Sequence, residues 1–264
     1  MSEANISRID AAFRNKPIFM PYYPLGYPDL ETSLEVIEAL AEKGADLVEV
    51  GLSFSDPLAD GPVIQKATQV ALEQGITVKK ALAAVAELRK RGVTIPLVLM
   101  GYYNPLLAYG LEKIVCDAQS AGADGFIIPD LPGEEAGEFE QALRKVAVRM
   151  PLIRMIAPTT SPGRMEAIAR EAPGFIYLVS VTGITGERRE VAAGLADLIA
   201  CVRAFTSTPV CVGFGIGTPE QAKAVGALAD GVIVGSACVR EVGESPAPVA
   251  AARAFAKRFK RALR

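Results

Sequence analysis

The sequence contains no histidine in its 264 residues. Histidine is the side chain that most often acts as a general base near neutral pH, and it is the commonest metal ligand in proteins. Its absence excludes a Ser-His-Asp triad and most zinc and non-haem iron sites. Acid–base chemistry in this chain must therefore depend on carboxylates, tyrosine, lysine or cysteine.

The sequence also lacks paired cysteines, an apolar run of 18 residues and a strong net charge. No Cys-x-x-Cys spacing joins the four cysteines, which is typical of free thiols in a reducing compartment. The N-terminus shows no basic segment followed by an apolar one, so we expect a soluble, cytoplasmic protein. A formal net charge of −2 gives no field that would attract nucleic acid or an anionic membrane. The expected partner is a small molecule or another protein.

Short apolar runs alternate along the chain with segments of helical periodicity. The runs that predict strands are residues 18–22, 47–50, 96–100, 125–128, 152–156, 175–180, 210–212 and 231–234. The amphipathic segments include residues 30–42, 79–91, 111–121, 134–146 and 219–225. Strands buried on both faces need helical crossovers, so this pattern favours a closed (β/α)8 TIM barrel forming a single domain over residues 1–264. An open, doubly wound sheet would give similar signals and is the alternative.

A similar tripeptide precedes three of the predicted strands: Gly44-Ala45-Asp46, Gly122-Ala123-Asp124 and Leu228-Ala229-Asp230. Such repeated punctuation supports a repeated strand–helix unit. Two segments are extra to a minimal barrel. Residues 7–15 predict a helix that covers the barrel floor, and residues 62–74 predict a helix inserted before the segment at 79–91.

The last predicted helix is basic and amphipathic, which is compatible with a membrane or nucleic-acid contact. Phe255, Phe259 and Leu263 share one face of it by their four-residue spacing, and cations suit the C-terminal end of a helix. We therefore interpret this segment as a packed helix that closes the barrel.

Three glycine-rich turns follow the last three predicted strands, at residues 183–186, 213–217 and 235–236. Glycine lets backbone N–H groups approach an anion closely, and a helix that begins at Ser236 would direct its positive end to the same point. Barrels often bind phosphate there, so a phosphorylated metabolite is the predicted substrate. An ordinary tight loop is the alternative for each turn taken alone. The charged stretch at 187–190 predicts an exposed loop that either closes over the substrate or has no function.

Glu49 lies within an apolar strand and alternates with Val48 and Val50, so its side chain points away from theirs. Burying a carboxylate is costly, and the mouth of the barrel is the environment that tolerates it. Burial would raise its pKa and allow it to act as acid and as base. A structural ion pair is the alternative interpretation.

Further carboxylates lie on the predicted loops at the same end of the barrel. Asp60 is a second candidate, although its place before Gly61-Pro62 also fits a cap of the helix that follows. Asp56 precedes a proline and is interpreted as a turn residue or a partner contact. Asp130 follows the fourth strand and ranks third.

No lysine falls at a predicted C-terminal strand end. Carbon–carbon cleavage normally needs a Schiff-base lysine or a metal as electron sink, so here the substrate itself would have to serve. Apolar and aromatic residues at or after the strand ends predict a pocket, with core packing as the alternative. They are Tyr22, Met100, Tyr102, Ile127, Tyr177 and Phe214.

Residues 49–62 read EVGLSFSDPLADGP, and this segment closely resembles the α chains of tryptophan synthase. The likeness continues through PYYPLGYP at 21–28, GYYNP at 101–105, PDLP at 129–132, YLVSVTGITG at 177–186 and GFGI at 213–216. It covers essentially the whole chain. The resemblance implies a lyase that splits indole-3-glycerol phosphate into indole and glyceraldehyde 3-phosphate, in the last steps of tryptophan biosynthesis.

The same resemblance implies that indole passes to a pyridoxal-phosphate β chain within an α2β2 tetramer, while this chain needs no cofactor and no metal. The implied catalytic residues are Glu49, Asp60 and Tyr177. The implied substrate-binding residues are Tyr22, Ile64, Met100, Tyr102, Ile127, Thr185 and Phe214. The implied phosphate-binding residues are Gly186, Gly215, Gly235 and Ser236. A stand-alone lyase that releases free indole, and a non-catalytic barrel that only activates the β chain, are the competing interpretations.

Overall fold

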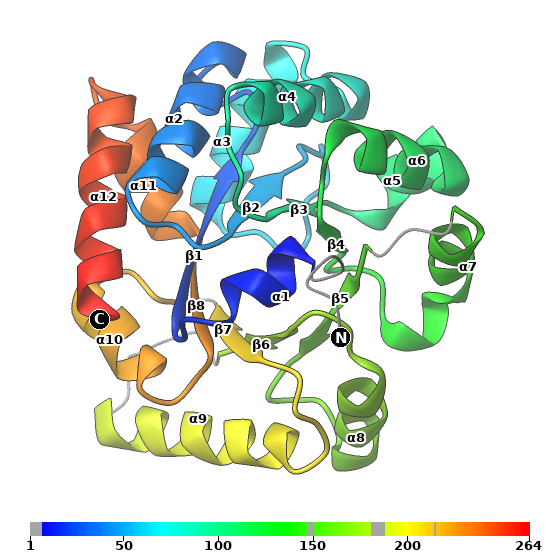
Figure 1. The fold of residues 1–264 in the computed structure, drawn as a ribbon, viewed down its shortest axis with the longest axis vertical. Coiled ribbons are helices and arrows are strands. Elements are labelled where there is room, and N and C mark those ends of the chain that lie inside the picture. Colours follow the sequence, from blue (N-terminus) through cyan, green and yellow to red (C-terminus); the bar gives the residue numbers. More distant parts are fainter. Residues whose placement is uncertain (1–6, 147–149, 181–187, 214) are drawn as a thin grey trace.

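A computed structural model describes residues 7–146, 150–180, 188–213 and 215–264. Eight parallel strands form a closed barrel in sequence order (Figure 1). The strands are β1 (Ile18–Pro24), β2 (Val48–Gly51), β3 (Leu97–Met100), β4 (Gly125–Ile127), β5 (Leu152–Ile156), β6 (Ile176–Val179), β7 (Val210–Gly213) and β8 (Gly231–Val234). β1 pairs with both β2 and β8, which closes the sheet. The TIM barrel is thus confirmed, and the open-sheet alternative is wrong.

Helices surround the barrel, as Figure 1 shows. They are α1 (Arg8–Ala12), α2 (Leu30–Glu42), α3 (Pro62–Glu73), α4 (Val78–Lys90), α5 (Tyr103–Tyr109), α6 (Leu111–Ala121), the 3₁₀ helix η2 (Gly133–Glu135), α7 (Gly137–Lys145), α8 (Pro162–Glu171), α9 (Arg188–Arg203), α10 (Pro219–Gly226), α11 (Ser236–Gly243) and α12 (Pro248–Ala262). None of the helices in the described part of the chain has the length and apolar character required to span a bilayer.

Three segments differ from the sequence-based prediction. The single helix expected at 134–146 is divided into η2 and α7, because the Ala136 N–H bonds to the Gly133 carbonyl in a tighter 3₁₀ turn. Helix α5 is not among the segments predicted from the sequence, and its Pro105 lies in the first turn, where a proline costs no helical hydrogen bond. Residues 188–190, expected in a loop, begin α9, while residue 187 lies outside the described residues.

The aspartates of the repeated tripeptides hold the end of the barrel where the strands begin. The Asp46 carboxylate accepts the Phe19 N–H of β1, Asp124 accepts the Leu97 N–H of β3, and Asp230 accepts the Val210 N–H of β7. Each carboxylate also pairs with cations: Asp46 with Lys260, Asp124 with Arg8 and Arg89, and Asp230 with Lys16 and Arg203. Helix α1 covers this end, as expected, since it supplies the Arg8 that pairs with Asp124.

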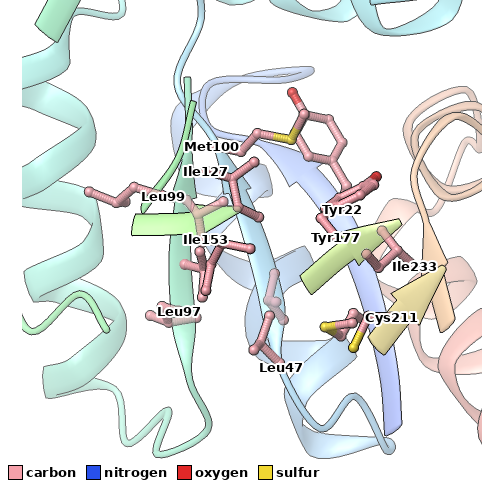
Figure 2. Close-up of a cluster of buried hydrophobic side chains, with 14 of the residues drawn as sticks. Tyr22, Leu47, Leu97, Leu99, Met100, Ile127, Ile153, Tyr177, Cys211 and Ile233 are labelled. Atoms are coloured by element: carbon pink, nitrogen blue, oxygen red, sulfur yellow. The ribbon is translucent and has the colours of Figure 1, made fainter. Parts of the chain in front are cut away.

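The barrel interior is filled by side chains from the strands. In Figure 2, Leu47 and Cys211 lie toward one end of the cluster, and Tyr22 and Met100 lie toward the other. All four are buried. The larger side chains of Tyr22 and Met100 thus lie toward the C-terminal ends of their strands.

Helix α12 packs against the barrel through one aromatic face. Phe255, Phe259 and Leu263 are buried, which confirms the interpretation of this segment as a packed closing helix. The ring of Phe259 stacks on that of Phe19 in β1, with centroids 5.5 Å apart and an interplanar angle of 11°. The basic residues of the helix lie in its last turn and on its exposed side.

We expect Phe259→Ala to lower the free energy of unfolding by about 3–5 kcal/mol, because it removes a fully buried ring and leaves a cavity between α12 and β1. Urea denaturation followed by circular dichroism measures this loss. Lys257→Ala, an exposed change on the same helix, is the control and should stay within about 0.5 kcal/mol of the parent. Equal stability of the two variants would contradict the packing described here.

Candidate active site

Glu49 lies in the middle of β2 with its side chain inside the barrel. It is 1% exposed, and its Oε1 has no hydrogen-bond partner among the described residues. No ion pair of the described chain includes it, so the structural ion-pair alternative finds no support. Burial raises the pKa of the Glu49 carboxyl from 4.5 to about 8. Near neutral pH the group is therefore mostly protonated and can donate a proton.

Asp60 lies on the loop between β2 and α3. The cap position of α3 is occupied by Gly61 with no side-chain cap, so the interpretation of Asp60 as a helix cap is wrong. Burial raises the pKa of the Asp60 carboxyl from 3.8 to about 6, while a hydrogen bond with the Tyr102 side chain opposes that rise. Near neutral pH Asp60 is mostly ionised, in contrast with Glu49.

Glu49 and Asp60 line the same cavity, which has a volume of about 450 Å³. It lies at the C-terminal end of the barrel, because it is bounded by residues at or after the ends of β3, β7 and β8. Its described lining also contains Tyr22, Ala59, Gly61, Ile64, Met100, Tyr177, Gly215, Ile216, Gly217, Ile233, Gly235, Ser236, Ala237 and Arg240. No lysine is among them.

Two tyrosines, Tyr22 from β1 and Tyr177 from β6, form part of the cavity wall. A Cβ atom at Gly51 would overlap the hydroxyl of Tyr22, and one at Gly213 would overlap the hydroxyl of Tyr177. Both glycines end their strands, β2 and β7. Glycine at these two positions therefore leaves the room that the phenol groups occupy. Burial and the nearby Glu49 and Asp60 carboxyls raise the pKa of both phenols, so they remain protonated.

Glycine turns form another part of the cavity wall. Gly215 has φ +78°, a left-handed conformation that favours glycine, and Gly217 follows it in the same turn. Helix α11 begins at Ser236 after Gly235, with no side chain capping its first N–H groups. These groups carry a partial positive charge and lie beside the cavity, which suits an anionic ligand.

The cavity brings together nine of the residues singled out from the sequence, namely Tyr22, Glu49, Asp60, Ile64, Met100, Tyr177, Gly215, Gly235 and Ser236. Tyr102 and Ile127 are buried but are not part of the described lining. Thr185, Gly186 and Phe214 lie outside the described residues. Asp130 lies outside the cavity and accepts the Tyr103 N–H at 2.9 Å, and Asp56 is exposed and accepts the Ser55 hydroxyl.

Sequence reasoning missed Arg240, the one cationic side chain in the described lining. A signal for it was present, because Arg240 follows Ser236 by four residues and such residues share a helix face. The small residues Ala59 and Ala237 were also missed, and their sequence context carries no signal beyond proximity to Asp60 and Ser236.

The fold and the cavity define a (β/α)8-barrel protein in which two carboxyls of different pKa line one cavity together with glycine turns. The chain belongs to the tryptophan synthase α chain family, whose model matches residues 9–263. It is 54% identical to the tryptophan synthase α chain of Chloroflexus aggregans over 222 residues, which cover 83% of this chain and 82% of that one. It is 49% identical to that of a Roseiflexus species, over 93% of this chain and 92% of that one.

Solved structures agree with the family. The α subunit of tryptophan synthase from Legionella pneumophila superposes with a TM-score of 0.88 at 36% identity, over 98% of this chain and 99% of that one. A chain from the ligand-free tryptophan synthase of M. tuberculosis gives a TM-score of 0.87 at 34% identity, over 98% of this chain and 99% of that one.

The raised pKa of Glu49 predicts a pH-dependent stability. The folded state keeps this proton up to about pH 8, whereas an unfolded glutamate loses it near pH 4.5. Between these values the folded state binds more protons, so the free energy of unfolding falls as the pH rises, by at most about 1.4 kcal/mol per pH unit. Glu49→Gln lacks this component, and urea denaturation of both proteins at several pH values measures the difference. An identical pH dependence would mean that Glu49 ionises normally in the folded protein.

Proposed function

We propose that this chain catalyses the α reaction of tryptophan synthase, the retro-aldol cleavage of indole-3-glycerol phosphate to indole and glyceraldehyde 3-phosphate. The observation that carries the proposal is a buried Glu49, whose Oε1 has no hydrogen bond among the described residues and which shares a cavity with Asp60 and with the glycine turns. A protonated carboxyl, an ionised carboxyl and an anion-binding wall are the three groups that this reaction requires.

In the proposed reaction, Glu49 donates its proton to C3 of the indole ring. The ring becomes a cationic indolenine, which takes up the electron pair when the bond from C3 to the glycerol chain breaks. The hydroxyl on the departing carbon loses its proton to the Glu49 carboxylate and becomes the aldehyde oxygen, so the proton count is unchanged. The substrate thus supplies the electron sink, and the chemistry requires no cofactor, lysine or metal from this chain.

Asp60 has the opposite task in this proposal. Its pKa of about 6 keeps it ionised near neutral pH, where it can accept the indole N–H and stabilise the cationic intermediate. Tyr177, buried beside Gly213, is proposed to support the glycerol chain. We assign the indole ring to the part of the cavity formed by Tyr22, Ile64 and Met100. Tyr102 and Ile127, which are buried but do not line the cavity, are assigned to support this part, and Phe214, which lies outside the described residues, is assigned to it as well.

The phosphate is assigned to the part of the wall formed by the glycine turns. Backbone N–H groups at Gly215 and Gly235 and the first turn of α11 at Ser236 can donate to its oxygens. Thr185 and Gly186, which lie outside the described residues, complete the assignment. Arg240 adds a positive charge at the same wall and is exposed enough to reach an entering dianion.

We further propose that the chain works with a tryptophan synthase β chain in an α2β2 tetramer, and that pyridoxal phosphate is bound only by the β chain. Family membership and the likeness to chains of the M. tuberculosis enzyme support this assembly. The substrate is expected to be the phosphorylated indole, with no role for nucleic acid or membrane.

Glu49→Gln removes the transferable proton while it keeps the volume of the side chain. We expect indole release from indole-3-glycerol phosphate to fall by a factor of about 10² to 10⁴, with the affinity for glycerol 3-phosphate nearly unchanged. Glu35→Gln, an exposed change on α2, is the control and should retain full activity.

The same assay, run with and without a β chain, separates the competing interpretations. A partnered α chain gains turnover when the β chain is added, and a stand-alone lyase does not. A barrel that only activates the β chain would release no indole itself, and its Glu49→Gln variant would activate the β chain as well as the parent does. The absence of indole release from the parent protein, both with and without the β chain, would overturn the proposed function.

The two carboxyls predict a bell-shaped pH dependence of kcat/KM for indole release. Activity should rise through about pH 6 as Asp60 ionises, and it should fall above about pH 8 as Glu49 loses the proton that it must donate. Initial rates over this range test both limbs. A rate that keeps rising above pH 8 would contradict the assignment of Glu49 as the acid.

A further inference from the structure

We propose that Tyr102 is a positioning residue, whose phenol hydroxyl ties the loop between β2 and α3 to the end of β3 and thereby orients the Asp60 carboxylate. The proposal rests on the function assigned to Asp60 above. It gives Tyr102 a task different from lining the cavity, of which it is not part.

The hydrogen bonds of the Tyr102 hydroxyl carry the proposal. Its oxygen accepts the Ala59 N–H at 2.9 Å, and a second hydrogen bond joins it to the side chain of Asp60. A phenol has one O–H to donate and lone pairs to accept, so it satisfies both neighbours at once. The O–H therefore donates to the Asp60 carboxylate while the oxygen holds the backbone of the preceding residue.

Few other contacts fix this loop. The remaining hydrogen bonds of residues 55–60 in the described chain stay within the loop or join it to α3, as the Gln65 side chain does with the Asp60 carbonyl at 2.8 Å. Leu58 is 91% exposed, so apolar burial contributes little here. The ring of Phe54 contacts that of Tyr102, with centroids 5.7 Å apart. Tyr102 is thus the link from the loop to a neighbouring strand of the barrel.

Tyr102 is itself held firmly. It is 5% exposed and precedes the first residue of α5, directly after β3 and Gly101. A hydrogen bond from a buried residue at the barrel rim to the loop between β2 and α3 reduces the number of orientations that the Asp60 carboxylate can adopt. The arrangement places Asp60 relative to Glu49, which β2 fixes separately.

The charged and polar groups around Asp60 allow the effect of Tyr102 on the pKa of Asp60 to be measured. The titratable groups that face Asp60 and Tyr102 are Tyr22 on β1, Glu49 on β2, Tyr177 on β6 and Asp130 after β4. None of these supplies a positive charge, and Arg240, the cation of the described cavity lining, is not among the groups that shift the pKa of Asp60. The Tyr102 O–H is the group that lowers the pKa of Asp60 against the effect of burial, so its removal should raise that pKa above about 6.

Tyr102→Phe tests the proposal, because it removes the hydroxyl and keeps the ring against Phe54. We expect kcat/KM for indole release to fall about tenfold and the acidic limb of its pH profile to move upward by about one unit. The affinity for glycerol 3-phosphate should change less than about twofold, since the phosphate wall is untouched. Tyr103→Phe, the same change at the adjacent residue, is the control and should leave the profile unchanged, because its hydroxyl does not contact Asp60.

A carboxyl titration of Asp60 by carbon-13 NMR keeps this test separate from the proposed reaction. An upward shift of the Asp60 pKa in Tyr102→Phe, absent in Tyr103→Phe, supports the positioning role even if the parent protein releases no indole. A loss of activity with an unchanged acidic limb and an unchanged Asp60 titration would show a merely structural role and overturn the proposal. An unchanged activity and titration would overturn it as well.

Discussion

The burial of the Glu49 carboxyl, with no ion pair in the described part of the chain, is the constraint on which the candidate site depends. An ionised carboxylate in that position would be costly, so the folded protein keeps the proton, and the group becomes an acid poised near neutral pH. Asp60 lies in the same cavity but retains a hydrogen bond and part of its solvent contact, which keeps its pKa lower. Two chemically similar groups thus differ in protonation state because their surroundings differ, and acid–base chemistry without histidine depends on that difference.

One end of the barrel contains the contacts that stabilise the strands, and the other end contains the cavity. Where the strands begin, Asp46, Asp124 and Asp230 tie strand N–H groups to basic side chains. Where the strands end, glycines replace side chains, and the spaces that they leave hold phenol groups and a ligand cavity. This separation lets the C-terminal loops carry strained or loosely held residues while the other end keeps the barrel closed.

Much of the fold follows from patterns of residue type alone. All eight strands were located within about two residues of their ends because a parallel barrel strand is an apolar run bounded by turn residues. The division of the helix near Ala136 and the short helix α5 were not predicted. Both depend on local backbone hydrogen bonds, which the residue types at these positions do not specify. Asp60 was ambiguous because the sequence before Gly61-Pro62 fits a helix cap as well as a site residue. The two are distinguished by the cap position of Gly61 and by the place of Asp60 in the cavity lining.

The sequence by itself determined the barrel, the buried position of Glu49 and the positions of the glycine turns. The barrel and Glu49 follow from the periodicity of apolar residues, and the turns follow from the glycines themselves. The tertiary structure alone decided which groups meet. Tyr102 contacts the loop of Asp60 and does not line the cavity, whereas Arg240 lies in the cavity wall with Ser236. The phenols of Tyr22 and Tyr177 lie against Gly51 and Gly213. The contacts of Tyr102, Tyr22 and Tyr177 join residues from different strands and loops, and the burial that sets each pKa exists only once the barrel has closed.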